Sequence, residues 1–139
     1  MALGRIGASA VIAISIALLG ASVVPAEHNP FAKSGAFAAC ARQAHSATFP
    51  LLHCYSVESQ AADAAMAAAY RGALAGVVDH KTRSYLARSQ AAWSDFRDAW
   101  CEATVPRSGS LARIKLFECR LAETKRRTTA LKAATSSAD

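Results

Sequence analysis

The chain has 139 residues, of which 53% are hydrophobic, and a net charge of +6 at neutral pH. This length suffices for one domain and excludes a two-domain enzyme, a Rossmann domain or a TIM barrel. After residue 26, no apolar stretch reaches the roughly 18–20 residues that are needed to span a bilayer.

Residues 1–26 have the pattern of a secretory signal peptide. Arg5 precedes an apolar run from Ile6 to Val24, and Val24 and Ala26 occupy the small-residue positions of a cleavage site. No cysteine follows the run in a lipobox position, so no lipid anchor is expected. We expect cleavage near Ala26 and a periplasmic or secreted protein. The alternative is an uncleaved N-terminal membrane anchor.

The mature chain begins with two segments that lack a helical pattern. Residues 27–39 contain Asn, Pro and Gly among scattered alanines, which predicts a flexible lead-in. Residues 40–57 are predicted to form an irregular cap that is broken at Pro50 and closed by a disulfide between Cys40 and Cys54.

The first predicted helix covers residues 57–77, with Ser56 as its N-cap. Met66, Tyr70, Leu74 and Val77 recur at steps of three and four residues and form one apolar stripe.

The second predicted helix covers residues 80–102 and is capped by Asp79. It carries Trp93, Phe96 and Trp100 at three- and four-residue steps. Trp93 and Phe96 are predicted to lie in the core, whereas Trp100 lies close to the helix end.

The third predicted helix covers residues 111–133, with Ser110 as its N-cap, and residues 134–139 are expected to form a frayed tail. Pro106 and Gly109 mark the preceding segment as a loop. Because these connections are short, the prediction is an all-α fold, a small antiparallel three-helix bundle stapled by two disulfides.

The four cysteines all lie in the mature part, and an even count in a small exported chain indicates disulfides. The local pairs Cys40–Cys54 and Cys101–Cys119 are the favoured connectivity of the three that are possible. A structural metal is the alternative, since His28, His45 and His53 lie near these cysteines. No CxxC or HxxxH spacing supports it, so we expect no metal and no cofactor.

The charge pattern bears on the class of partner. Removal of Arg5 with the signal peptide leaves +5, and the segment 111–133 alone carries +5. Its cations are Arg113, Lys115, Arg120, Lys125, Arg126, Arg127 and Lys132. An exported basic protein meets anionic envelope polymers and lipid headgroups rather than nucleic acid. The alternative is that these cations form ordinary solvated helix faces.

Catalytic signatures are missing from the sequence. No serine lies in a GxSxG context, no glycine-rich phosphate loop is present, and Asp95 and Asp98 lie three residues apart on one helix rather than across a cleft. The sequence therefore predicts a binding protein and not an enzyme.

The cysteines belong to a longer pattern, which includes the stretch SQAAWSDFRDAWC. Its members are Cys54, Asp63, Met66, Tyr70, Gln90, Trp93, Arg97, Asp98, Cys101, Gly109, Ser110, Cys119, Thr124, Arg127 and Leu131. This pattern resembles the lysozyme inhibitor LprI-like family, and the resemblance covers residues 40–133. It implies an exported helical domain, and some members of the family inhibit lysozyme.

The pattern residues also have physical interpretations, which are mainly structural. Trp93 is expected to fill the core, and Tyr70 to lie in the core with its hydroxyl at the rim. Arg97 is expected to pair with Asp63. In the same way, Arg127 is expected to pair with Asp98, so that ion pairs join neighbouring helices.

The resemblance suggests a blocking element, the loop of Pro106, Arg107, Ser108, Gly109 and Ser110. Arg107 would pair with a carboxylate of a lysozyme cleft, while the two serines would add hydrogen bonds. An ordinary polar connection between helices is the alternative interpretation. A second functional hypothesis is an envelope-associated binding module whose basic third helix contacts anionic polymer or lipid.

Overall fold

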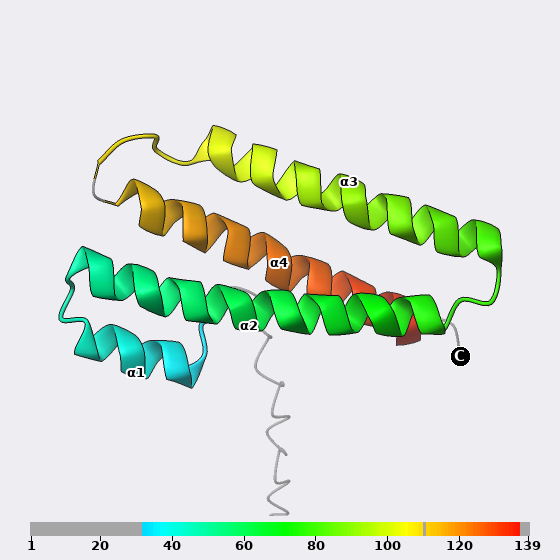
Figure 1. The fold of residues 1–139 in the computed structure, drawn as a ribbon, viewed down its shortest axis with the longest axis horizontal. Coiled ribbons are helices and arrows are strands. Elements are labelled where there is room, and N and C mark those ends of the chain that lie inside the picture. Colours follow the sequence, from blue (N-terminus) through cyan, green and yellow to red (C-terminus); the bar gives the residue numbers. More distant parts are fainter. Residues whose placement is uncertain (1–31, 110, 137–139) are drawn as a thin grey trace, which may run out of the picture.

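The computed structural model describes residues 32–109 and 111–136, and this part of the chain forms four helices and no strand (Figure 1). They are α1 (Gly35–Gln43), α2 (Thr48–Ala75), α3 (His80–Thr104) and α4 (Ala112–Ser136). The all-α prediction is confirmed, but the prediction of three helices is wrong. The predicted signal peptide, the start of the lead-in and Ser110 lie outside the described residues.

α4 is the central helix of the bundle and makes its most extensive contacts with α2. Contacts between the two helices pair Tyr55 with Glu118 and Glu58 with Lys125, so both helices run in the same direction. α3 runs antiparallel to both and covers a narrower strip of α4. Consecutive long helices are therefore antiparallel, as expected, but the pair with the largest interface is parallel.

α1 occupies the region predicted to be a flexible lead-in followed by an irregular cap, and that prediction is wrong. Ser34 caps α1, because its hydroxyl accepts a 3.0 Å hydrogen bond from the Phe37 N–H. The Phe37 ring packs edge-on against Tyr55 of α2, with ring centroids 4.7 Å apart. This aromatic contact and the capping bond keep the short helix folded against its neighbour.

Pro50 does not break the chain, because it lies in the first turn of α2. The first N–H groups of a helix have no acceptor within the helix, so a proline there forfeits no hydrogen bond. α2 therefore starts at Thr48 and not after Ser56. Asp79 caps α3 as predicted, with a 2.7 Å bond from the Thr82 N–H. α4 extends to Ser136, beyond the predicted end at residue 133.

The hydrophobic core is small and rich in alanine. Its members are Ala44, Cys54, Tyr55, Ala62, Ala73, Cys101, Ile114, Leu121, Ala122 and Leu131. The prediction that Phe96 lies in the core is wrong, since its side chain is 51% exposed, and Trp93 is only half-buried. Only Cys101 of α3 is fully buried, because this helix rests on α4 through one narrow face.

Both predicted disulfides are present, Cys40–Cys54 between α1 and α2 and Cys101–Cys119 between α3 and α4. Tyr55 follows Cys54, and its hydroxyl donates a 2.5 Å hydrogen bond to Glu118, which precedes Cys119. Two covalent bonds and one hydrogen bond thus connect all four helices at a single level. We call this level the cross-linked layer.

Ion pairs extend the cross-linked layer toward the segment before α1. Burial alone would raise the pKa of Glu118, but hydrogen bonds from Tyr55, Lys115 and Lys33 outweigh it and lower the pKa to about 2. One turn further along α2, Glu58 accepts bonds from Ser34 and Lys125. These bonds outweigh burial in the same way, and the pKa of Glu58 is lowered.

Acid is therefore expected to weaken the fold through these carboxylates. The pKa of Glu118 is lower in the folded protein than in the unfolded chain, so its stabilisation is complete above about pH 5 and is lost as pH falls toward 2. Glu118→Gln removes this contribution, lowering the free energy of unfolding at pH 7 by about 2 kcal/mol. Urea unfolding at pH 7 and pH 3 measures it. A variant whose stability falls between these pH values as steeply as wild type would contradict the assignment.

Candidate binding site

The connection between α3 and α4 projects from the end of the bundle that lies close to the cross-linked layer (Figure 1). Pro106, Arg107, Ser108 and Gly109 are all exposed, whereas Val105 is half-buried. Gly109 has a φ of 96°, which a residue with a side chain rarely adopts, and its carbonyl accepts a 3.1 Å bond from the Ala112 N–H. The loop therefore turns sharply into α4 and presents Arg107 to solvent.

The loop borders an open hollow of about 390 Å³. The residues that line it are Glu102, Val105, Pro106, Arg107, Ala112, Arg113 and Leu116. Cys101 and Cys119 close the base of this connection covalently, three residues before the end of α3 and within the second turn of α4. The disulfide limits how far the two helix ends can separate, and so restricts the loop.

The turn between α1 and α2 lies at the same end of the bundle (Figure 1). His45 and Ser46 both have positive φ angles, 44° and 64°, which are unusual for residues other than glycine. Phe49 follows in the first turn of α2 and is 79% exposed. A second connection, closed by its own disulfide, therefore presents a large apolar side chain at this end.

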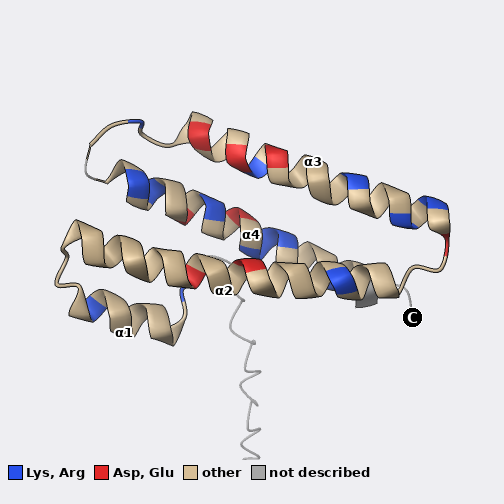
Figure 2. Ribbon diagram, in the orientation of Figure 1, with Lys and Arg blue, Asp and Glu red and all other residues tan. Residues whose placement is uncertain are grey.

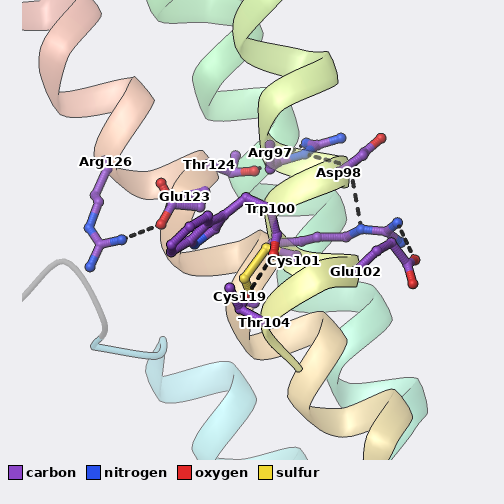
Figure 3. The surroundings of a disulfide bond; sticks show 11 residues. Arg97, Asp98, Trp100, Cys101, Glu102, Thr104, Cys119, Glu123, Thr124 and Arg126 are labelled. Carbon is purple, nitrogen blue, oxygen red and sulfur yellow. Dashed lines mark hydrogen bonds and ion pairs between the residues drawn. A yellow bond between two sulfur atoms is a disulfide. The ribbon is translucent and has the colours of Figure 1, made fainter. Parts of the chain in front are cut away.

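Several residues of the sequence pattern meet in a polar cluster between α2, α3 and α4 (Figure 3). Arg97 lies 3.5 Å from Asp63, as predicted, and 3.0 Å from Asp98. Thr124 is 2% exposed, and its hydroxyl accepts a bond from Arg97 and donates one to Asp63. We call Asp63, Arg97, Asp98 and Thr124 the Arg97 cluster.

Arg120 extends the Arg97 cluster, although sequence reasoning did not assign it a place there. Its guanidinium lies 3.4 Å from Asp98 and 3.1 Å from Glu102. The hollow at this position has a volume of about 230 Å³ and is lined by charged, hydroxyl and apolar groups. Because the cations and carboxylates here already pair with each other, the cluster mainly sets the register of the three helices.

Trp93 lies under two guanidinium groups, at 5.2 Å from Arg97 and 5.9 Å from Arg127. The predicted pair between Arg127 and Asp98 is wrong. Arg127 instead donates to Gln90 at 2.9 Å and to Ser89 at 3.0 Å. The Cys101–Cys119 disulfide sets the antiparallel register of α3 and α4, and this register places Arg127 more than one turn away from the level of Asp98.

Tyr70 is predicted to lie in the core, but it is not among the buried residues, and Gln90 is the remaining pattern residue. Tyr70 is half-buried, and it lies close enough to Arg127 to offset part of the lowering of that residue's pKa by burial. Gln90 is half-buried too and reaches from α3 to the Met66 sulfur of α2 at 3.0 Å.

Most of the basic charge on α4 is engaged by carboxylates. Two of the ion pairs lie within the helix, Lys115 with Glu118 and Arg126 with Glu123. The others reach neighbouring helices: Arg120 pairs with Asp98 and Glu102 of α3, and Lys125 pairs with Glu58 of α2. Figure 2 shows acidic positions among the basic ones along α4. The hypothesis of an anionic polymer on this helix therefore receives no support from these contacts.

Tyr55, Glu58 and Glu118 are the important residues that sequence reasoning missed. Pro50 near a predicted helix start is a recognisable signal for the true start of α2. No local signal identifies the hydrogen bond between Tyr55 and Glu118, because these two residues are 63 positions apart in the sequence.

Taken together, these features define a small all-helical domain whose disulfides brace two exposed connections at one end. In the described residues, no group of three or more His, Cys, Asp or Glu side chains is arranged to hold a metal ion. No helix in the same part of the chain is long and apolar enough to cross a membrane.

The chain belongs to the lysozyme inhibitor LprI family, whose model matches residues 40–131. The match confirms the resemblance noted from the sequence pattern and spans all four cysteines. No curated protein and no solved structure matched the sequence.

If the Arg97 cluster is structural, Arg97→Gln should destabilise the protein by about 2 kcal/mol, because Thr124 and two carboxylates lose their charged donor. Arg97→Lys should restore only part of this, since an ammonium group cannot replace a planar guanidinium that bonds several partners. Urea unfolding measures both variants, and Arg71→Gln on the exposed side of α2 is the control. Equal stability of Arg97→Gln and the control would contradict this role.

Proposed function

We propose that the protein is an exported inhibitor that binds a lysozyme and blocks its cleft with the loop-bearing end of the bundle. Membership of the lysozyme inhibitor LprI family supports the class of partner, and two disulfides in a small domain are consistent with export. The carrying observation is the exposed loop from Pro106 to Gly109, held at its base by Cys101–Cys119.

A braced loop suits an inhibitor for a physical reason. Binding orders flexible segments at a cost in free energy, and a loop already restricted in the free protein avoids most of that cost. The disulfide beneath the loop and the sharp turn at Gly109 both restrict it before binding.

Arg107 supplies the electrostatic part of the interaction. It is the only cation of the segment 105–109, and it is exposed. Glycosidases of the lysozyme type use a pair of carboxylates beside the scissile bond, so their cleft attracts an inserted guanidinium. Arginine can also bond a carboxylate through two parallel N–H groups, which fixes orientation as well as charge.

Phe49 supplies an apolar contact at the same end of the bundle. Its 79% exposure is unusual for a large aromatic residue, and the neighbouring turn holds two non-glycine residues at positive φ. Aromatic side chains often contribute strongly to protein–protein interfaces. The binding edge we propose therefore consists of the α3–α4 loop and the start of α2.

The experiment is a lysozyme inhibition assay with the oxidised exported protein, on several lysozyme types and at low and high salt. We expect stoichiometric inhibition that persists at high salt, because insertion of a loop depends on short-range contacts. Binding to a polyanion would instead weaken steeply as salt rises. If no lysozyme type is inhibited, the proposed function is wrong.

Arg107→Glu should raise the inhibition constant by about tenfold or more, because it places a carboxylate against the carboxylates of the cleft. The matched control is Arg71→Glu, which makes the same charge change near the C-terminal end of α2, whereas the loop lies at the end of the bundle where α2 begins. The Arg107 variant should unfold at the wild-type urea concentration, since the side chain is exposed. Equal inhibition constants for the two variants would exclude Arg107 from the contact.

A further inference from the structure

The outward side of α3 carries an exposed stripe along almost the whole helix. The residues of the stripe follow one another at steps of three and four, which places them on one face of the helix. They are Tyr85, Arg88, Ala92, Phe96, Ala99 and Ala103. All six are exposed, and Tyr85 and Phe96 are 53% and 51% exposed, respectively. Cys101, which anchors α3 to α4, lies on the opposite side of the helix.

The charges of α3 are arranged against its own helix dipole. Lys81, Arg83 and Arg88 lie in the first half, whereas Asp95, Asp98 and Glu102 lie in the second together with a single cation, Arg97 (Figure 2). Cations are unfavourable near the start of a helix and carboxylates near its end. Asp98 and Glu102 already pair with Arg120 within the chain, whereas Arg88 and Asp95 lie on or beside the exposed stripe. A second copy with its α3 antiparallel would bring each Arg88 close to the Asp95 of the other copy.

We propose that the outward face of α3 is a homodimer interface, on which a second copy packs with its own α3 antiparallel to the first. This inference does not depend on the proposed inhibition of lysozyme. In a two-fold symmetric dimer the same surface of each copy forms the contact. The residues of the stripe, taken in sequence order, must therefore fit the same residues taken in the opposite order.

The stripe meets this requirement when the axis passes beside Ala92. The two copies of this small residue then face each other at the crossing point, where the helix backbones approach most closely. Tyr85 of one copy lies opposite Ala99 of the other, so that a large side chain meets a small one. Arg88 lies opposite Phe96 and within reach of Asp95, which is one residue away along the helix.

Arg88 and Asp95 are available for contacts between copies. The Arg88 guanidinium is held over the Tyr85 ring of its own helix, 4.6 Å from the centroid, so its position is already restricted. The Asp95 carboxylate forms no ion pair or hydrogen bond with another side chain within residues 32–109 and 111–136. Phe96 stacks on Trp100, and both rings remain about half exposed. A second copy would cover the open face of Phe96.

The test is sedimentation equilibrium of the oxidised exported protein between about 1 and 100 µM, a range that covers typical dissociation constants of modest dimers. We expect a monomer–dimer equilibrium for wild type. Arg88→Glu and Asp95→Arg should each weaken the dimer by about tenfold, because each places like charges together. The variant with both changes should recover the wild-type dimer, because each pair again joins opposite charges.

The control is Arg71→Glu, which changes the charge equally on α2 and should leave the dimer intact. The affected side chains are exposed, so the helical circular dichroism of every variant should equal that of wild type. A wild type that stays monomeric throughout this range would overturn the proposal. A dimer that both single reversals leave unchanged would overturn it as well, because the interface would then lie elsewhere.

Discussion

The hydrogen bond between Tyr55 and Glu118 is the contact on which the arrangement of the four helices depends. Tyr55 adjoins the Cys40–Cys54 disulfide and Glu118 adjoins the Cys101–Cys119 disulfide, so this bond connects the α1–α2 pair to the α3–α4 pair. The apolar core is small, and four of its ten residues are alanine, so large interlocking side chains contribute little to the geometry. Directional bonds in this layer therefore define how the two pairs dock, and the Arg97 cluster adds further bonds between them.

The position of this layer has a consequence for binding. α1 and α3 end three residues beyond their cysteines, and α2 and α4 begin less than two turns before Tyr55 and Glu118. Both exposed connections therefore emerge close to the most constrained part of the molecule. The proposed dimer contact is centred on Ala92, near the middle of α3, so most of it lies away from this end.

Local sequence patterns were sufficient to predict α3 and α4 and the pairing of the cysteines, because helix periodicity and short spacings are local properties. They were sufficient for the contact between Arg97 and Asp63 as well. They failed for α1, where alanine and glycine leave little periodicity, and for Phe96, whose apolar character did not indicate which side of α3 is covered. They did not indicate that α2 and α4 would have the most extensive contacts, which long-range pairs such as Glu58–Lys125 establish.

The most direct test of the cross-linked layer is hydrogen exchange of the oxidised wild type and Tyr55→Phe, which removes one hydroxyl. Tyr55 joins the two disulfide-linked helix pairs, so amide exchange should accelerate in each pair. We expect faster exchange in α1, which belongs to the first pair, and in the first two turns of α4, which belongs to the second. Amides in the first half of α3, far from the layer, should change little. Acceleration confined to α2, or equal acceleration throughout the chain, would contradict the role of this bond as the link between the pairs.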